Sequence, residues 1–437
     1  MSMLKKKLGT TSMVATSTGM ALSSSIFPAI ILAIGNLGML TAMSAIAIAG
    51  ILNFTIAIHF ANLSQMFPEA KGIKGYLHEA FGEKISSFFS LLYLLLTWVA
   101  GALEIYIFSY VISYLGQYFK LPIVSSIPGI GWTIFLLCLF FLLNLWDVEV
   151  ASKWQSIITY GMFTLLVLFS MYVFFQPTHQ IDISPINFSW NSFIMAVGVS
   201  MYLFRGFEWV VHMAGEVKNI KVVARALPIS IMVLTGVYLI YTSTLPLNHS
   251  LSMQILSSPV PHLLLSKLFG WIALAMMGLI SLMATLTTYN ATMMGVSRMI
   301  YDLASVNLLP QIFTRVHGKF RTPWVAIVAT FLIQLVFALL VSVTHNFHIP
   351  ILMATIIQGI VYALSGTAIW ILRNKARQNQ FLWFRGSSTI ALFSTGIFIY
   401  LSMIVILPSL NGSVGISLLI TTLLTFVYVF SVKRTSL

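Results

Sequence analysis

The feature that most constrains this chain is a series of apolar runs, each about 20 residues long, separated by short polar joints. A helix of about 20 apolar residues crosses the roughly 30 Å of hydrocarbon in a bilayer. These runs are too long and unbroken for barrel strands, so they predict helices whose backbone groups bond internally. Twelve spans are expected, at residues 8–34, 40–66, 86–118, 131–148, 154–175, 191–215, 228–247, 264–301, 324–343, 350–372, 388–408 and 412–432.

Composition excludes a water-soluble protein. Charged residues make up 8% of the 437 residues and hydrophobic residues 59%, whereas soluble domains carry roughly 25% charged residues. The whole chain, residues 1–437, is therefore expected to form a single domain embedded in the lipid bilayer.

The position of the basic residues predicts the orientation of the chain. Of 23 Lys and Arg residues, 20 fall in loops that share one side when the N-terminus is inside. Lys120 and Lys267 fall on the other side, and Arg205 lies within a span. Because basic loops stay in the cytoplasm, both termini are expected there, and the net charge of +13 requires no nucleic acid partner. Short termini and compact loops favour a bacterial cytoplasmic (inner) membrane.

Two spans are unusual membrane helices. The first is rich in Ser, Thr and Gly between Thr10 and Ser25, and such a segment should not face lipid. It predicts either an interrupted helix that lines a cavity or close packing of helices. The sixth span places Arg205, Gly206 and Glu208 among apolar residues. Each intramembrane charge costs on the order of 3 kcal/mol, so these charges indicate a substrate or proton path or a buried ion pair.

Interrupted helices at corresponding positions of two repeats indicate a transporter site. Half-helix N-termini offer free N–H groups and a favourable dipole to a substrate carboxylate, and unwound carbonyls can hold an ammonium. An α-amino acid carries both groups. The two unusual spans therefore predict an amino acid or a related small amine as substrate.

Four segments carry a resemblance to a known family. They are Gly19 to Pro28, Pro68 to Gly82, Gly206 to Asn219, and Asn290 to Pro323 with its ordered Ser297, Arg298, Tyr301, Pro310, His317 and Pro323. On these residues the chain resembles the amino acid, polyamine and organocation superfamily of permeases. It departs from the family pattern at Ser23 and Ser25, which replace glycines, and at Ile220, which replaces a proline.

The resemblance implies an all-α membrane protein of twelve transmembrane helices. Residues 8–175 and 191–372 would form a five-plus-five inverted repeat in which helices one and six are discontinuous, and residues 388–432 would add two helices. It also implies alternating access to a site near the membrane midplane.

The resemblance further implies which residues bind substrate: Ser23, Ser24, Ser25, Ile26, Glu104, Tyr202, Phe204, Arg205 and Thr288. Arg205 is unusual at its position. It would either pair with Glu104 or bind an anionic substrate side chain through its planar fork.

Glu208 matches a residue of the family that serves proton-linked gating, and His212 could share its proton or be a packed core histidine. Coupling to protons is the expectation. A sodium site at Thr285 and Thr287 is less expected, and no Lys in residues 154–175 replaces a sodium ion. No catalytic residue, cofactor or metal site is predicted.

The leading hypothesis is an amino-acid permease that works by proton symport or by exchange, as a monomer or homodimer. A polyamine or amine antiporter and a non-transporting amino-acid sensor of the same fold are the alternatives. An enzyme would need a nucleophile with its base or a metal cluster, and a channel would need a continuous polar lining. The sequence contains neither pattern.

Overall fold

The computed structural model describes residues 6–67, 72–176, 189–258, 260–344, 348–372, 396–397, 400 and 413–431. Every regular element in these residues is a helix, and one isolated bridge joins Leu8 to Val217. Seven helical segments of this part are long and apolar enough to cross a membrane, or eight when one bent pair counts as a single span. The chain is an all-α integral membrane protein, while the count of twelve spans and the inverted repeat stay predictions.

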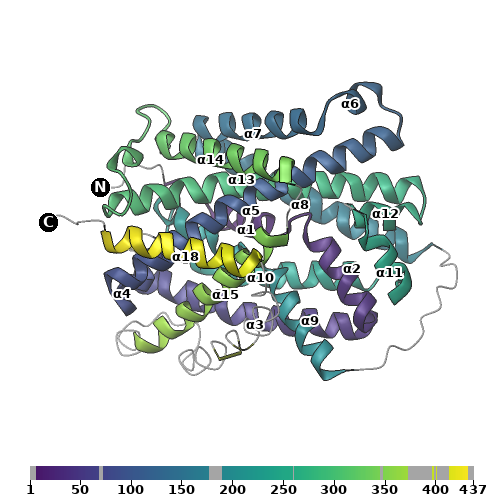
Figure 1. Cartoon of the computed structure of the whole chain (residues 1–437), viewed down its shortest axis with the longest axis horizontal. Helices are drawn as coiled ribbons and strands as arrows, with labels where there is room; N and C mark the ends of the chain where they lie inside the picture. Colours follow the sequence, from purple (N-terminus) through teal and green to yellow (C-terminus); the bar gives the residue numbers. More distant parts are fainter. Residues whose placement is uncertain are drawn as a thin grey trace.

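The helices lie alongside one another in one bundle (Figure 1). The first part of the chain forms α1 (Thr10–Ala21), α2 (Ile26–Leu37), α3 (Met39–Met66), α4 (Gly72–Phe81), α5 (Glu83–Tyr118), α6 (Pro122–Ser126), α7 (Gly129–Trp146) and α8 (Val148–Phe174). The second part forms α9 (Trp190–Tyr202), the 3₁₀ helix η1 (Phe207–Glu216), α10 (Lys221–Thr242), α11 (His249–Leu256), α12 (Pro261–Lys267), α13 (Trp271–Ser305), η2 (Gln311–Thr314), α14 (Trp324–Thr344), α15 (His348–Ile371) and α18 (Ser413–Ser431). The predicted span 388–408 lies outside the described residues apart from 396–397 and 400.

Two predicted boundaries were wrong. The span expected at 264–301 divides into α12 and α13, because Gly270 between them adopts a φ of +94° that ends one helix before the next begins. The span expected at 228–247 begins seven residues earlier, at Lys221, so Pro228 lies inside α10. A proline there removes one backbone donor, and α10 is nevertheless continuous through it and packs against α1 and α3.

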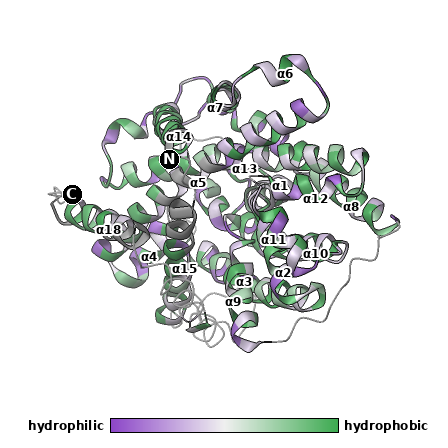
Figure 2. Ribbon diagram, turned by 45° about the vertical axis from the view of Figure 1, so that its right-hand side comes forward, coloured by the Kyte–Doolittle hydropathy of each residue, from purple (hydrophilic) through white to green (hydrophobic). Residues whose placement is uncertain are grey.

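Hydrophobic residues predominate along most helices of the bundle (Figure 2). Large apolar side chains such as Phe135, Leu142, Ile157 and Val336 are exposed on α7, α8 and α14. Exposed apolar surface of this extent is unfavourable in water and favourable against lipid tails.

Helix α1 lies in the middle of the bundle, as predicted for a segment that avoids lipid (Figure 1). Its residues Met13 to Ala21 are all buried, and it packs against α8, α10, α13 and η1. Thr16 and Thr18 donate their hydroxyls to carbonyls of the preceding turn, at 2.9 and 2.7 Å. Small side chains that satisfy their own polar groups let this helix fit among its neighbours.

The predicted interruption of the first span is present. Helix α1 ends at Ala21, α2 begins at Ile26, and their axes differ by 58°. The sixth span is interrupted too, since α9 ends at Tyr202 and the chain continues as η1 only from Phe207. We call residues 22–25 the first break and residues 203–206 the second break.

Gly206 allows the second break to form. Its φ is +98°, and a Cβ atom at this position would lie 2.7 Å from Cγ of Met20 in α1. Any residue that has a Cβ atom is strained in this backbone conformation.

We expect Gly206→Ala to destabilise the protein by about 1 to 3 kcal/mol, because the backbone is strained and Met20 must move. Thermal unfolding in detergent measures the effect. Gly236→Ala in α10 is the matched control, since a Cβ there meets no atom within 4 Å. Equal melting temperatures for the two variants would contradict the role given to Gly206.

Candidate functional site

Side chains of neighbouring helices satisfy the backbone groups that the first break exposes. Thr288 of α13 donates its hydroxyl to the carbonyls of Gly19 and Met20, at 3.1 and 3.4 Å. Thr288 was predicted to contact substrate, and in this structure its hydroxyl is hydrogen-bonded to the carboxyl end of α1. The last carbonyls of a helix need such partners where water is excluded.

Tyr238 of α10 joins the two breaks. Its hydroxyl lies 2.6 Å from the carbonyl oxygen of Leu203 and 3.5 Å from that of Ala21. Ser17 adds a second link by donating to the carbonyl of Phe207 at 2.8 Å. The two interrupted helices are thus held against each other at the level where both lose regular structure.

A glutamate occupies the free donors of the first break. Glu104 of α5 accepts the backbone N–H of Ser24 at 3.2 Å and the hydroxyl of Ser25 at 2.8 Å, one on each carboxylate oxygen. Ser23 lies 2.7 Å from Ser25 through their hydroxyls, and the Tyr202 hydroxyl lies 3.4 Å from Ser25. We call the Ser24 N–H and the Ser25 hydroxyl the cradle. Three predicted serines, Glu104 and Tyr202 therefore meet at one place.

The cradle continues into a buried chain of hydroxyls. Ser24 Oγ lies 2.7 Å from Ser281 Oγ and 3.2 Å from Thr285 Oγ1, and His262 Nε2 lies 3.0 Å from Ser281 Oγ. The expected spans 228–247 and 264–301 leave His262 in the loop between them, but it lies on α12 with 2% of its surface exposed. Folding of α12 back over α13 buries this histidine, and a seven-residue helix gives no clear signal in the sequence.

Arg205 lies in the second break and forms no ion pair with any carboxylate of the described residues. Its guanidinium stands 4.8 Å from the centre of the Tyr202 ring. Its Nη1 is buried and has no hydrogen-bond partner in this part of the chain. The predicted pair with Glu104 is absent, because both oxygens of that carboxylate are bound at the cradle.

Glu208 is enclosed by donors. Tyr93 and Tyr362 donate their hydroxyls to its two oxygens, the latter at 2.6 Å, and Gln358 lies at 3.4 Å. The backbone N–H of Gly206 donates to Glu208 at 3.2 Å, so the carboxylate is tied directly to the second break. Four donors therefore surround both oxygens of one fully buried carboxyl group.

His212 does not share this cluster. It lies four residues after Glu208 on a 3₁₀ helix, where three residues complete a turn, so the two side chains point in different directions. Its Nδ1 lies 3.6 Å from Oδ2 of Asp302, and its ring packs on Gly72, where a Cβ would lie 2.1 Å from Nδ1. In this structure His212 is packed apart from Glu208, and the predicted sharing of a proton between them stays a prediction.

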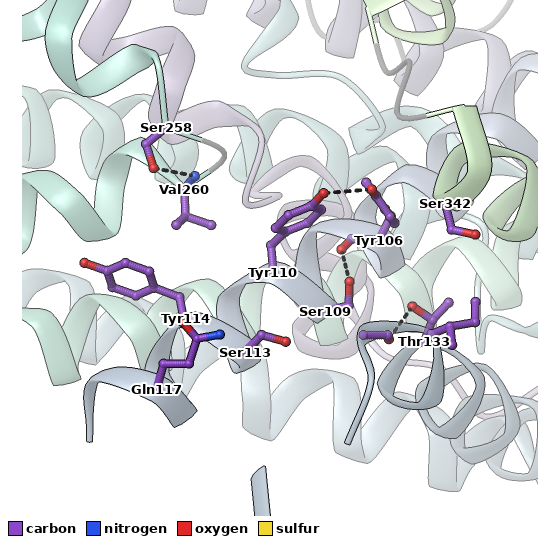
Figure 3. Close-up of a pocket in the computed structure, with 12 residues that line it drawn as sticks. Tyr106, Ser109, Tyr110, Ser113, Tyr114, Gln117, Thr133, Ser258, Val260 and Ser342 are labelled. Atoms are coloured by element: carbon purple, nitrogen blue, oxygen red, sulfur yellow. Dashed lines mark hydrogen bonds between the residues drawn. The ribbon is translucent and has the colours of Figure 1, made fainter. Parts of the chain in front are cut away.

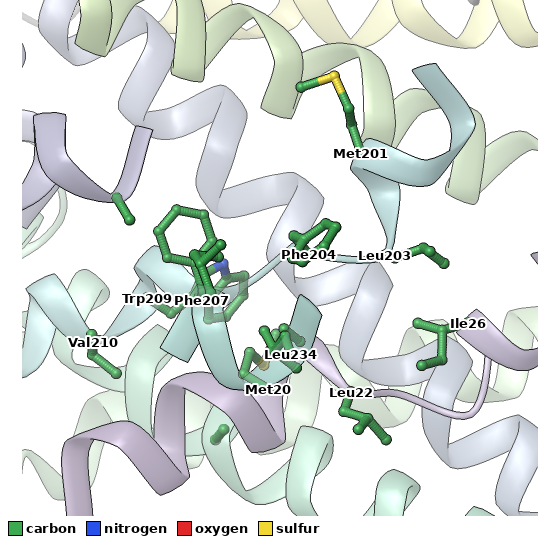
Figure 4. Close-up of a cluster of buried hydrophobic side chains, with 14 of the residues drawn as sticks. Met20, Leu22, Ile26, Met201, Leu203, Phe204, Phe207, Trp209, Val210 and Leu234 are labelled. Atoms are coloured by element: carbon green, nitrogen blue, oxygen red, sulfur yellow. The ribbon is translucent and has the colours of Figure 1, made fainter. Parts of the chain in front are cut away.

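Ile26 and Phe204 lie in the apolar core that surrounds the breaks and not at the cradle (Figure 4). Both side chains are almost fully buried, and the Phe204 ring packs edge-on against Tyr238, with the ring centroids 5.3 Å apart. The predicted contact of these two residues with substrate stays a prediction.

A buried ion pair closes the end of the bundle that carries η1. Arg298 of α13 donates to both oxygens of Glu216, from Nε at 2.9 Å and from Nη2 at 3.0 Å. At most 1% of either residue is exposed. Nearby, the backbone N–H groups of Lys7 and Leu8 donate to the Glu216 carbonyl, and hydrogen bonding to Glu149 raises the pKa of the exposed Lys7 ammonium.

A polar pocket of about 530 Å³ lies beside the carboxyl-terminal half of α5 (Figure 3). Tyrosine and serine side chains of α5 line it, together with residues of α7 and the end of α14. Tyr106 at its wall is two residues beyond Glu104 on the same helix, and its hydroxyl lies 2.9 Å from that of Tyr110.

Sequence reasoning missed the partners of Glu208. Gln358 is a polar residue inside an apolar span, and that signal alone could have marked it. Tyr93 and Tyr362 could not be separated from packing aromatics, because only the fold brings their hydroxyls to one carboxylate.

The profile of a family described as amino acid permease matches residues 8–430. Three curated relatives come from Bacillus subtilis (strain 168). The glutamate/serine transporter AimA is 26% identical over 65% of this chain and 57% of its own length. The serine/threonine exchanger SteT is 24% identical over 86% and 85%, and the aspartate-proton symporter is 27% identical over 64% and 56%. The matched region thus spans little more than half the length of two of these relatives.

We expect Glu216→Gln to lower the free energy of unfolding by about 3 to 5 kcal/mol, because it leaves the Arg298 charge buried and uncompensated. Thermal unfolding followed by tryptophan fluorescence measures this loss. Glu149→Gln is the control, since it removes an exposed carboxylate that pairs with Lys7 and Lys153. Its melting temperature should stay close to that of the wild type. A Glu216→Gln protein as stable as this control would show that the pair does not stabilise the fold.

Proposed function

This chain belongs to the amino acid permease family, and from that premise we propose that it is a secondary transporter that carries an amino acid across a membrane by alternating access. In this proposal twelve helices form a five-plus-five inverted repeat with two additional helices. Both termini lie on the cytoplasmic side of a bacterial inner membrane, as the distribution of basic residues indicates.

The observation that carries the proposal is the carboxylate already bound at the first break. Glu104 places its two oxygens on the Ser24 N–H and the Ser25 hydroxyl. The α-carboxylate of an amino acid offers the same two acceptors. Glu104 therefore acts as an internal stand-in, and a substrate carboxylate would take its place on the cradle.

Displacement of Glu104 would also create the second half of the site. A carboxylate released from the cradle remains buried and needs a positive partner. The α-ammonium of the incoming amino acid supplies that charge. Glu104 would then hold the ammonium while Ser24 and Ser25 hold the carboxylate, which is the pattern that distinguishes an amino acid from a simple acid or amine.

The two ends of the bundle differ in a way that fits alternating access. The polar pocket beside α5 lies toward Tyr118, the end of that helix that faces outward in the proposed orientation. The Glu216–Arg298 pair and the bridge from Leu8 to Val217 close the opposite, inward end. We assign these contacts to a state that is closed on the cytoplasmic side.

The names of the relatives support amino acids as substrates. They are compatible with two modes of coupling, exchange of substrates and symport with protons. One relative is named as an exchanger and another as a proton symporter. Glu208 is our candidate for the coupling proton, because it bonds directly to the Gly206 N–H. Protonation would weaken its hold on the second break and so connect a proton to the conformation of the site.

Uptake of radiolabelled neutral, acidic and basic amino acids into proteoliposomes tests transport. We expect saturable uptake of one class by the wild type and a decrease of at least about tenfold in kcat/KM for Glu104→Gln, since the amide cannot hold the ammonium as strongly. Glu149→Gln, an exposed carboxylate on α8, is the matched control and should transport like the wild type.

Two results would contradict this assignment. Binding of an amino acid without any flux would identify a sensor of the same fold. Saturable uptake that Glu104→Gln leaves unchanged would remove Glu104 from the site while leaving transport itself intact.

The coupling role of Glu208 is tested separately, with the same vesicles and an imposed inward proton gradient. We expect the gradient to accelerate uptake by the wild type and to have no effect on Glu208→Gln, which cannot release a proton. Exchange of internal for external substrate should persist in this variant, because it needs no net proton movement. If Glu208→Gln still responds to the gradient, the coupling proton binds elsewhere.

A further inference from the structure

The guanidinium of Arg205 lies in the second break, and its Nη1 finds no acceptor among the described residues. Nη1 is buried and lacks a hydrogen-bond partner, and no carboxylate of this part of the chain lies within ion-pair distance. The Tyr202 ring covers one face of the guanidinium at 4.8 Å but offers its edge no acceptor. Arg205 as a whole is only partly buried, but its Nη1 is cut off from solvent. A buried donor without an acceptor is costly, and a ligand that supplies an acceptor would satisfy it.

The two glutamates that the described residues place at the breaks are bound to other groups. Glu104 is bound at the cradle, and Glu208 accepts from Tyr93, Tyr362 and Gly206. Arg205 acts electrostatically on both glutamates without touching either. Its planar fork is therefore left for an acceptor that comes from outside, and a carboxylate fits such a fork with two parallel hydrogen bonds.

The position of Arg205 relates this acceptor to the cradle. The Tyr202 ring that carries the guanidinium on its face has its hydroxyl 3.4 Å from Ser25 Oγ. The Tyr202 side chain thus lies between the Ser25 hydroxyl, which would hold the α-carboxylate, and the Arg205 guanidinium, which has no anionic partner. A ligand that fills both places has two carboxylates joined by a short aliphatic chain.

We propose that Arg205 determines substrate specificity by binding the side-chain carboxylate of an acidic amino acid, so that aspartate or glutamate is the preferred substrate. This assignment rests on the proposed function, because it assumes that the cradle holds the α-carboxylate. The competing role is internal: once substrate displaces Glu104, that carboxylate would pair with Arg205 whatever the substrate side chain is. The two roles differ in whether Arg205 affects acidic substrates alone or all substrates alike.

The test compares isosteric ligands on the purified full-length protein. Equilibrium binding of aspartate against asparagine, and of glutamate against glutamine, is measured for wild type, Arg205→Gln and Arg205→Lys. Arg225→Gln is the matched control, because Arg225 is exposed on α10 away from both breaks. We expect the wild type to bind each acid at least about tenfold more tightly than its amide.

In Arg205→Gln we expect the affinity for the acids to fall by about 30-fold or more, while that for the amides changes by less than about threefold. Arg205→Lys should keep part of the preference, since it retains the charge without the fork. The control should bind all four ligands like the wild type. This pattern would establish Arg205 as the residue that reads the side chain.

Two patterns would overturn the assignment while leaving transport of amino acids in place. One is a wild type that binds the amides, or serine, as tightly as the acids. The other is an equal loss for acids and amides in Arg205→Gln, which would favour the internal pair with Glu104. If Arg205→Gln does not fold, the acid and amide comparison on the wild type decides alone. A wild type that binds none of these ligands would overturn the proposed function itself.

Discussion

The structure depends on the requirement that a helix interrupted inside a membrane must find partners for its freed backbone groups within the protein. Side chains from three helices meet this requirement at the first break. Thr288 of α13 and Tyr238 of α10 lie against the carbonyls at the end of α1, and Glu104 of α5 takes the N–H of Ser24. The break is therefore a property of the bundle, and the groups that permit it are also the groups that a ligand would meet.

The charged side chains at the two breaks and at the end of η1 fall into two kinds. Glu216 and Arg298 satisfy each other with two hydrogen bonds, which is the arrangement expected of a structural contact. Arg205 lacks such a partner, and Glu104 has neutral donors in place of a cation. Unbalanced charges of this second kind are costly for the empty protein, so their presence at the breaks is what connects the fold to the binding of a charged substrate.

Much of the fold followed from the sequence because membrane helices are set by local composition. The interruption of the first span and the unusual sixth span were visible as Ser, Thr and Gly or as charges in apolar surroundings. The sequence misjudged α12 and the start of α10, since a glycine turn and a tolerated proline change helix limits without changing hydropathy. The predicted spans also left His262 in a loop and could not decide between the two roles of Arg205, because burial and side-chain direction depend on neighbours far away in the chain.

By itself the sequence determined the all-α membrane class, the two places where helices break, and the polar residues found there. The length of an apolar run and the polar residues within it can be read from neighbouring residues alone. Because polar residues inside a lipid bilayer are costly, the few that occur in apolar runs stand out in the sequence. Only the tertiary structure decided which groups meet: Glu104 with Ser24, Glu208 with Tyr93 and Tyr362, and Arg205 with no carboxylate at all in the described residues. Hydrogen bonds at about 3 Å depend on how helices distant in the sequence rotate and pack against one another, and no local pattern encodes that rotation.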